Sequence, residues 1–243
     1  VNRFAVTPGQ NITVFTNNDD GWQTARDLLL KNIKVAAIID SRPIKPVLRI
    51  AGAEIFMGVD VIDTKGRRGL KSIKLSNGKT IETDTLAVSG GWNPNLHLTC
   101  HHRGIPKWNE EIASFIPDES VPPGMIVAGR AKGTMVLADA IIEAHNMGSL
   151  VAKELGFKAA KLAHASTPEV AYNVSAHWGV ESGSKRAWVD FQNDVTAKDI
   201  KLANQEGFKS VEHVKRYTTL GMATDQGKTA NVLGIGIMAQ NMD

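Results

Sequence analysis

Cysteine is almost absent from this sequence, because Cys100 is the only one in 243 residues. A single thiol cannot form an intramolecular disulfide, and it cannot supply the ligands of a zinc ribbon or a cysteine-held iron–sulfur cluster. A chain without disulfides fits a reducing compartment, so we expect a cytoplasmic protein. The adjacent His101 and His102 would point to opposite faces of an extended segment. We therefore expect no metal site.

Long apolar runs and long runs of like charge are also missing. No stretch approaches the roughly 20 apolar residues that span a bilayer, and the first residues lack the apolar run of a signal peptide. The net charge is only +3, and the densest basic clusters, residues 65–68 and 215–216, are short. We therefore expect neither a membrane nor nucleic acid as a partner. The sequence starts at Val1 instead of methionine, so we expect a chain that was either processed or cut from a longer one. The resemblance described below implies an internal fragment of a larger subunit.

A strand, a helix and a second strand are indicated within the first 40 residues. Residues 12–16 are β-prone, residues 22–32 carry apolar side chains on one helical face, and residues 34–40 are almost continuously apolar. Continuous apolar runs are typical of strands that are covered on both sides. The spacing predicts a right-handed βαβ unit and an α/β fold.

Glycine is scarce where a dinucleotide-binding βαβ unit needs it. Such a unit carries G-x-G-x-x-G at its first turn and an acidic residue ~20 residues later. Asp40 stands near the acid position, but the turn reads TNNDDG at residues 16–21. Backbone could not approach a pyrophosphate closely there, and Asp19 and Asp20 would repel it. We expect a Rossmann-like shape without a working phosphate site, in which Asp19 or Asp20 is the helix N-cap.

The middle of the sequence predicts short strands and one long helix. Strands are expected at residues 54–57, 59–62, 73–75, 85–89 and 125–128. A type I′ hairpin turn is expected at Asn77-Gly78, because this pair suits two positive φ angles. Helical periodicity predicts a helix from about residue 134 to residue 155, which Gly156 ends.

The last part of the sequence predicts a helical module after an irregular segment at residues 157–187. A capping box at residues 196–199 starts a helix that ends at Gly207. A second helix starts at Ser210 and ends at Gly221. A turn at residues 225–229 and an apolar run at residues 232–239 follow.

The order of these parts resembles the second half of the pyridine nucleotide–disulfide oxidoreductase class. The segment GGWNPN at residues 90–95 is similar to the segment that marks the return from an inserted nucleotide domain to the first domain in that class. The segment VAG at residues 127–129, with its glycine-containing turn and long helix, resembles the part that lies beside the first domain's dinucleotide. The resemblance implies that the first domain's own glycine-rich strand lies outside this sequence.

The C-terminal residues narrow the resemblance. The runs VDFQNDVTAKDI, EGFKSVEHVKRYTT and DQGKTAN, at residues 189–200, 206–219 and 225–231, closely resemble the α subunits of heterotetrameric sarcosine oxidases. Related amine dehydrogenases carry an iron–sulfur module here. Its cysteine positions are occupied by residues that cannot replace thiolates, namely Asp190, Gln192, Asp225 and Ala230. The resemblance therefore implies a clusterless module and favours the sarcosine oxidase branch.

This resemblance implies an α/β fold with a Rossmann-like nucleotide-domain remnant and a small C-terminal helical module. Residues 1–92 would be an inserted Rossmann-like domain with a degenerate glycine turn, and residues 93–158 the C-terminal part of the first dinucleotide-binding domain. Residues 159–188 would be a linker. Residues 189–243 would be a helical module that resembles a cysteine-less iron–sulfur module.

The resemblance also implies the chemistry of the whole enzyme. Enzymes of this family demethylate sarcosine oxidatively: a flavin takes a hydride from the methyl–amine carbon, and electrons pass through FMN to oxygen. The amine-oxidising flavin would belong to the β subunit. The resemblance therefore implies that this chain carries no catalytic residue, is inactive alone and requires the β subunit and other subunits as partners.

Two segments are candidate cofactor sites by the same resemblance. Part of an NAD site is expected at the turn before the long helix, at Gly129, Arg130, Ala131, Gly133, Met135 and Leu137. The competing interpretation is a tight turn with solvated cations. Part of an FMN site, shared with the partner subunit, is expected where cations and hydroxyls suit a phosphate, at Lys215, Arg216, Thr218, Thr219, Gln226, Gly227, Lys228 and Thr229. The competing interpretation is a helix C-terminus whose dipole favours cations.

Two other functions stay open. The degenerate turn and the missing cluster ligands also fit a purely structural, subunit-docking module. A subunit of a related imino-acid or opine dehydrogenase is the third possibility, and the missing cysteines disfavour it.

Overall fold

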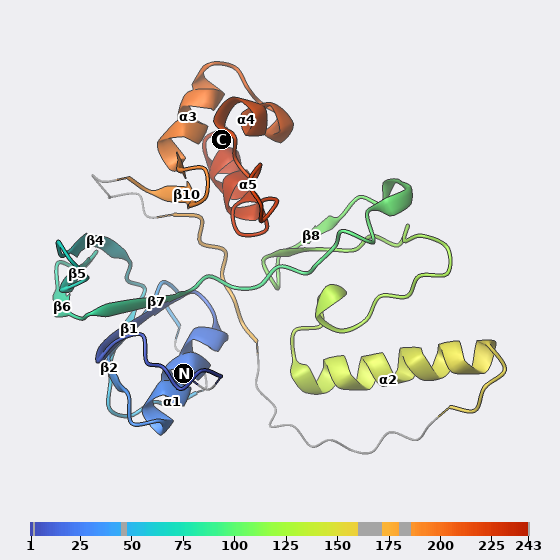
Figure 1. Ribbon diagram of the computed structural model, residues 1–243, viewed down its shortest axis with the longest axis horizontal. Coiled ribbons are helices and arrows are strands. Elements are labelled where there is room, and N and C mark those ends of the chain that lie inside the picture. The colour runs from blue at the N-terminus through green and yellow to red at the C-terminus, as the bar shows by residue number, and fades with distance from the viewer. Residues whose placement is uncertain (2, 45–47, 160–171, 180–185, 243) are drawn as a thin grey trace. The chain divides into compact units, whose positions relative to one another are not determined.

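The computed structural model describes residues 1, 3–44, 48–159, 172–179 and 186–242. The chain forms two compact units: unit 1 is Val1–Gly58 with Thr85–Ala176, and unit 2 is Val59–Asp84 with His177–Asp243. The predicted α/β class is confirmed, because unit 1 contains a parallel sheet and unit 2 ends in a small group of helices (Figure 1). In the described ranges, no helix has the length and apolar character needed to cross a membrane.

The predicted domain boundaries stay predictions. The predicted linker, residues 159–188, includes residues 160–171 and 180–185, which lie outside the described residues. Residues 59–84 group with the C-terminal part of the chain rather than with the sheet that flanks them in sequence.

A four-stranded parallel sheet organises unit 1, and the predicted βαβ unit forms its centre. The strands β1 (Asn11–Thr16), β2 (Lys34–Asp40), β3 (Glu54–Met57) and β7 (Thr85–Ser89) lie in the order β3-β2-β1-β7. Helix α1 (Asp19–Leu30) packs on this sheet, and the buried core that they share includes Ile12, Val14, Trp22, Ala25 and Ile38. The apolar run of β2 is buried, as a strand with two covered faces requires.

The N-terminus of α1 differs from the prediction. The cap is Asn18, whose side-chain oxygen accepts the Gly21 amide at 3.3 Å. Asp19 and Asp20 follow in the first helical turn, where the helix dipole favours carboxylates. The prediction of Asp19 or Asp20 as the N-cap is therefore wrong. The glycine that ends the turn serves close packing, because a Cβ on Gly21 would lie 2.2 Å from Thr16 Oγ1.

The rest of unit 1 contains a hairpin, two short turns and one long helix. The hairpin pairs β8 (Lys107–Asn109) with β9 (Ser114–Ile116). The adjacent histidines lie in a 3₁₀ turn, η1 (His101–Arg103), and not in the extended segment that was predicted. Among the described residues, no group of three or more His, Cys, Asp or Glu side chains could hold a metal ion.

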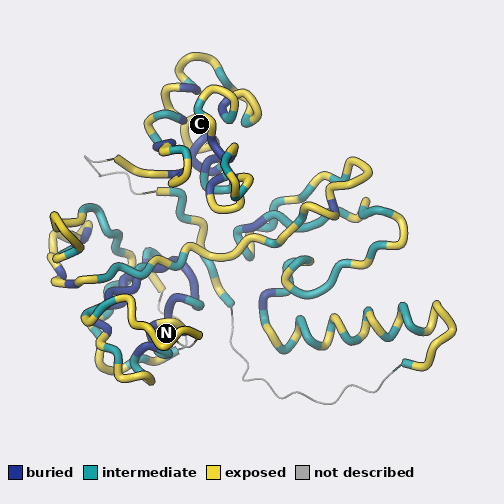
Figure 2. Tube along the Cα trace, in the orientation of Figure 1, coloured by how far each residue is buried: buried dark blue, intermediate teal, exposed yellow. Residues whose placement is uncertain are grey.

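Helix α2 (Leu137–Glu154) is the predicted long helix, but it begins later and contains no buried residue (Figure 2). It ends as predicted at Gly156, where the Gly156 and Phe157 amides donate to the Lys153 and Ala152 carbonyls at 3.0 and 2.8 Å. The strand predicted at residues 125–128 is wrong. The described residues supply no ladder partner for it, and β-propensity alone does not make a strand.

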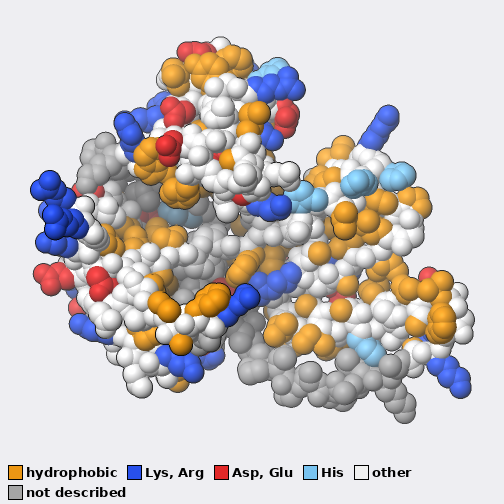
Figure 3. Space-filling model, viewed as in Figure 1, with side chains coloured by type: hydrophobic (Ala, Val, Ile, Leu, Met, Phe, Trp, Pro, Cys, Tyr) orange, Lys and Arg blue, Asp and Glu red, His pale blue; other side chains and the backbone are white. Residues whose placement is uncertain are grey.

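Unit 2 begins with an antiparallel sheet of β4 (Val61–Lys65), β5 (Ser72–Leu75) and β6 (Thr80–Glu82). The β5–β6 hairpin is present, but the predicted type I′ turn is wrong. Gly78 has φ +88° while Asn77 is not at positive φ, and the Gly78 amide donates to the Leu75 carbonyl at 3.0 Å. This is the pattern of a type I turn followed by a left-handed glycine. Lysine and arginine side chains gather over this sheet (Figure 3).

The C-terminal part of unit 2 is the predicted helical module. The ribbon of β10 (Trp188–Asp190) and β11 (Val195–Thr196) leads into α3 (Ala197–Gln205), α4 (Val211–Thr218) and α5 (Asn231–Gln240). The predicted capping box is confirmed at Thr196 and Asp199. Helix α4 ends earlier than predicted, because Thr219 adopts the left-handed region at φ +65°. The core of the module comprises Val189, Val195, Ile200, Ala203, Val214, Leu220, Ala230, Ile237 and Met238.

Candidate functional site

The turn before α2 holds the first predicted site, and an internal carboxylate occupies its donors. The Glu143 carboxylate accepts the Gly129 amide at 2.9 Å, Lys132 Nζ at 2.6 Å and Thr134 Oγ1 at 2.7 Å. These donors, the Lys132 ammonium first, lower the pKa of Glu143 to about 2. The groups that would bind an external anion are therefore satisfied by a side chain of α2.

Arg130, in the 3₁₀ turn η2 (Gly129–Ala131), contacts the start of α1 instead. Its Nη1 lies 3.9 Å from Asp20 Oδ2, and its guanidinium carbon lies 5.4 Å from the ring centroid of Trp92. The Trp92 indole donates a hydrogen bond to the same Asp20 carboxylate. The other predicted residues of this segment have no polar side chain: Met135 is buried, Ala131 and Gly133 are half-buried, and Leu137 is exposed.

The second predicted site lies in unit 2, where the end of α4 and the 225–229 turn approach each other. Gly221 and Gly227 have φ +69° and +73°, and a Cβ on Gly221 would lie 3.2 Å from the Gly227 Cα. A Cβ on either glycine would also lie within 2.2 Å of Asn231 Oδ1. The structure thus places Gly221, which follows α4, against Gly227 of the 225–229 turn, through an approach that glycine permits.

Some of the predicted donors in this second site already have internal partners. The Asp225 carboxylate accepts the Gly227 amide at 3.1 Å and the Thr229 amide and hydroxyl at 3.3 and 2.8 Å. The Thr218 hydroxyl donates to the Val214 carbonyl at 2.7 Å. In contrast, the side chains of Arg216, Gln226 and Lys228 are exposed.

Two shallow cavities flank Tyr217 beside this site. One, of about 350 Å³, is lined by Phe208, His213, Arg216 and Tyr217. The rings of Phe208 and Tyr217 lie 4.8 Å apart. The other, of about 360 Å³, is lined by Asn193, Asp194, Val195, Asp199, Leu202, Tyr217 and Thr218. An arginine beside an aromatic pair suits a planar, anionic ligand.

Two carboxylates at positions that the resemblance matches to cysteines of related modules bind backbone amides. Asp190 is 2% exposed and accepts the amides of Gln192, Asn193 and Gly221 at 2.9, 3.1 and 2.8 Å. It thereby ties the β10–β11 loop to the segment between α4 and α5. Asp225 closes the following turn in the same way. Ala230, at a third such position, is part of the apolar core.

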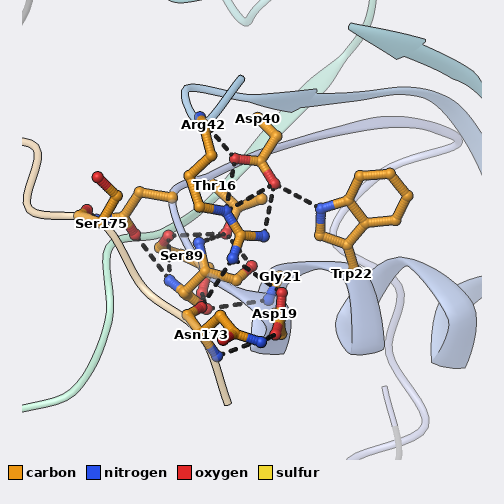
Figure 4. Close-up of polar contacts among 11 residues, drawn as sticks. Thr16, Asp19, Gly21, Trp22, Asp40, Arg42, Ser89, Asn173 and Ser175 are labelled. Carbon is orange, nitrogen blue, oxygen red and sulfur yellow. Dashed lines mark hydrogen bonds and ion pairs between the residues drawn. The ribbon is translucent and has the colours of Figure 1, made fainter. Parts of the chain in front are cut away.

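The carboxyl end of the unit 1 sheet, where a dinucleotide would lie, is filled by the protein's own side chains (Figure 4). Asp40 is fully buried, and its carboxylate accepts Trp22 Nε1 at 2.7 Å and Arg42 Nη2 at 2.7 Å. Arg42 Nη1 also lies 2.9 Å from Asp19 Oδ1. Burial lowers the pKa of Arg42, but the hydrogen bonds and charges of the two carboxylates raise it further, so the net shift is upward.

The residues that sequence reasoning missed are Arg42, Asn173 and Glu143. Arg42 stands two residues after the predicted acid, and this proximity was the one available signal. Asn173 and Glu143 gave no local signal, because their partners lie 154 and up to 14 residues away in sequence.

Comparison with known proteins supports the resemblance noted in the sequence. Residues 184–243 match the sarcosine oxidase A3 domain. Sarcosine oxidase subunit alpha of Rhizobium meliloti (strain 1021) is 39% identical over 99% of this chain and 25% of the relative. The chain is similar to sarcosine oxidase subunit alpha along nearly its whole length. The same subunit of Corynebacterium sp. (strain P-1) is 31% identical over 98% of this chain and 27% of its own length.

The chain thus spans about a quarter of the sarcosine oxidase alpha subunits that it matches. A solved structure, L-proline dehydrogenase from P. horikoshii, aligns over 98% of this chain and 46% of its own chain, with a TM-score of 0.71 and 18% identity. At this identity the likeness shows a shared fold alone. The oxidoreductase resemblance and the α/β fold are confirmed, whereas the individual site residues remain predictions.

Proposed function

We propose that this chain is a segment of a sarcosine oxidase-like alpha subunit and supports the oxidative demethylation of sarcosine in a cytoplasmic, multi-subunit flavoenzyme. The observation that carries the proposal is the 39% identity over 99% of the chain. The chain binds and orients cofactor and docks on a beta subunit and other subunits, while amine oxidation takes place outside it. The isolated chain is then inactive.

The FMN part of the proposal rests on side chains rather than on turn amides. Lys228 is an exposed cation that follows Gly227, and Arg216 is an exposed cation that lines a cavity with two aromatic rings. The Gly227 and Thr229 amides are bound to Asp225, so they are not available to a phosphate. FMN would supply an electron acceptor here. The proposed role of Lys215, Arg216 and Lys228 is to bind its phosphate.

The NAD part of the proposal depends on the position of the Glu143 carboxylate. The turn at residues 129–134 fits a pyrophosphate only when the Glu143 carboxylate leaves it, because that carboxylate takes the donors of Gly129, Lys132 and Thr134. We propose that NAD contacts this turn through Arg130 and the displaced Lys132.

A titration of the chain with FMN, followed by flavin fluorescence, tests the flavin role. We expect saturable binding that Lys228→Ala weakens by roughly tenfold, the loss of one charge-assisted contact of about 1.4 kcal/mol. Lys153→Ala, an exposed lysine near the end of α2, is the matched control and should leave binding unchanged. Equal affinities for all three proteins would exclude Lys228 from a flavin site.

A structural, subunit-docking role is the second candidate, and the filled turns favour it. Within the chain, Glu143 binds the donors of the first predicted site, and Asp225 binds the Gly227 and Thr229 amides of the second. Under this alternative, FMN does not bind at any concentration, and Lys228→Ala changes subunit assembly or nothing. The third possibility, an imino-acid or opine dehydrogenase subunit, has only the shared fold in its favour.

A further inference from the structure

The carboxyl ends of β1, β2 and β7 meet at Thr16, Asp40 and Ser89. Ligands of doubly wound sheets bind at this edge, beside the N-terminus of the first helix. Here the edge carries two buried carboxylates, Asp19 and Asp40, and one buried guanidinium, Arg42. The sum of these charges is negative, so the edge repels the pyrophosphate that such a unit otherwise binds.

A segment from far along the chain covers this edge. The Asp19 amide donates to the Asn173 carbonyl at 3.1 Å, and the Ser175 amide donates to the Asn17 carbonyl at 3.0 Å. Asn18 and Val174 form an antiparallel bridge between these two bonds. Residues 173–175 are therefore hydrogen-bonded to the turn through an isolated antiparallel β-bridge.

Side-chain hydrogen bonds also hold residues 173–175. Arg42 Nη1 donates to the Asn173 carbonyl at 2.8 Å while it pairs with Asp19, and both nitrogens of Asn173 donate to Asp19 Oδ2 at 2.9 and 2.8 Å. Asn17 Nδ2 donates to the Ser175 carbonyl at 2.7 Å. Arg42 thus bridges Asp40 of β2, Asp19 of α1 and the covering segment in one contact set (Figure 4).

We propose that Arg42 and Asn173 turn the ligand edge of this sheet into an intramolecular clasp, in which residues 173–175 take the place of a dinucleotide. The clasp holds the chain where it leaves unit 1, since unit 1 ends at Ala176 and unit 2 resumes at His177. Arg42 is then a positioning residue: it pairs with both Asp19 and Asp40 and binds the Asn173 carbonyl. A dinucleotide could not enter without displacing Asn173.

Amide hydrogen exchange on the 243-residue chain tests the clasp, with the amides of Asp19, Asn173 and Ser175 as reporters. Arg42→Gln leaves the buried carboxylates of Asp19 and Asp40 without their cation. We therefore expect the exchange rates of these three amides to rise by on the order of 100-fold. Amides of α3 should not change. Asn173→Ala keeps the Arg42–Asp40 pair and is the milder variant if Arg42→Gln does not fold. Arg68→Gln, an exposed arginine of unit 2, is the control and should change none of the reporters.

Unchanged exchange at Asp19 and Ser175 in both clasp variants would overturn the proposal. A second measurement adds NADH or ADP-ribose to the wild-type chain. We expect no change at the three reporters. Protection of the Asp19 amide together with faster exchange at Ser175 would mean that a dinucleotide displaces the segment, and would also overturn the proposal. Neither outcome depends on flavin binding in unit 2.

Discussion

Asp190 provides the strongest single test of how the C-terminal module is held together. Its buried carboxylate is the acceptor for three amides from two separate segments: Gln192 and Asn193 in the β10–β11 loop, and the buried Gly221 after α4. Replacing it with asparagine keeps the shape but turns one acceptor oxygen into an NH₂ group. At least one amide then faces a donor instead of an acceptor, and the remaining bonds lose their charge.

The expected cost follows from these contacts. A buried amide without a partner costs about 1–3 kcal/mol, and a hydrogen bond to a charged group contributes about 1.5–3 kcal/mol against about 0.5–1.5 kcal/mol for a neutral one. We therefore expect Asp190→Asn to destabilise unit 2 by about 2–3 kcal/mol. At a urea slope of about 1–3 kcal/mol/M, this loss lowers the unfolding midpoint of the module by about 0.7–3 M.

The assay is urea unfolding followed by far-UV circular dichroism, with hydrogen exchange of α3 and α5 amides to assign the transition to unit 2. Asp194→Asn is the matched control, because Asp194 is exposed, lies in the same loop and has φ +56°, which asparagine tolerates. We expect the control to stay within about 0.5 kcal/mol of the wild type. Equal midpoints for Asp190→Asn and the wild type would refute the role assigned to this carboxylate.

Further predictions concern unit 1 and the core of the module. The folded-state pKa of Glu143, about 2, lies below its ordinary value of 4.5, so the stability it contributes is complete above about pH 4.5 and is lost as pH falls toward 2. An NMR titration of the Gly129 amide should follow this midpoint, and Glu143→Gln should abolish the response. Gly148→Ala should stabilise α2 by about 0.5–1 kcal/mol in thermal unfolding, because no atom lies within 4 Å of the new Cβ. Gly236→Ala should destabilise unit 2 by about 1–3 kcal/mol, because its Cβ would lie 2.2 Å from Trp178. Equal changes in melting temperature for Gly148→Ala and Gly236→Ala would contradict the close packing of Gly236 in α5 against Trp178.

The parts of the fold that sequence predicted are those that local pattern determines. The β1–α1–β2 unit follows from a short β-prone run, a helical stripe and a continuous apolar run, and each signal lies within a dozen residues. The capping box at Thr196 and the glycine end of α2 follow from single-residue preferences for special backbone geometry. Such preferences need no distant partner.

The predictions that failed concern residues whose structure depends on a distant partner strand or on a choice between neighbouring residues with similar preferences. Asn17, Asn18, Asp19 and Asp20 are all acceptable N-caps, and only the fit of Gly21 against Thr16 places the helix start after Asn18. The segment at residues 125–128 has strand composition but gains no ladder partner in the described parts of the chain.

The sequence predicted where the candidate sites lie, but not which internal groups bind their hydrogen-bond donors. The sequence located the turns at residues 129–134 and 225–229, and both are present as turns. It did not reveal that Glu143 and Asp225 accept hydrogen bonds from the amides of these turns, since the donors that a carboxylate binds depend on the geometry of the folded chain. Asp225, two residues before Gly227, does carry a local signal, because Asp commonly bonds an amide two residues later.

A segment exchange tests whether this chain can serve as part of a sarcosine oxidase alpha subunit. In sarcosine oxidase subunit alpha of Rhizobium meliloti, the matching quarter would be replaced by residues 1–243, and the complex purified with its other subunits. We expect an assembled complex that retains bound flavin and consumes oxygen when sarcosine is added, and we expect Lys228→Ala to lower its FMN content. A complex that assembles with this segment but neither retains flavin nor oxidises sarcosine would contradict the proposed function.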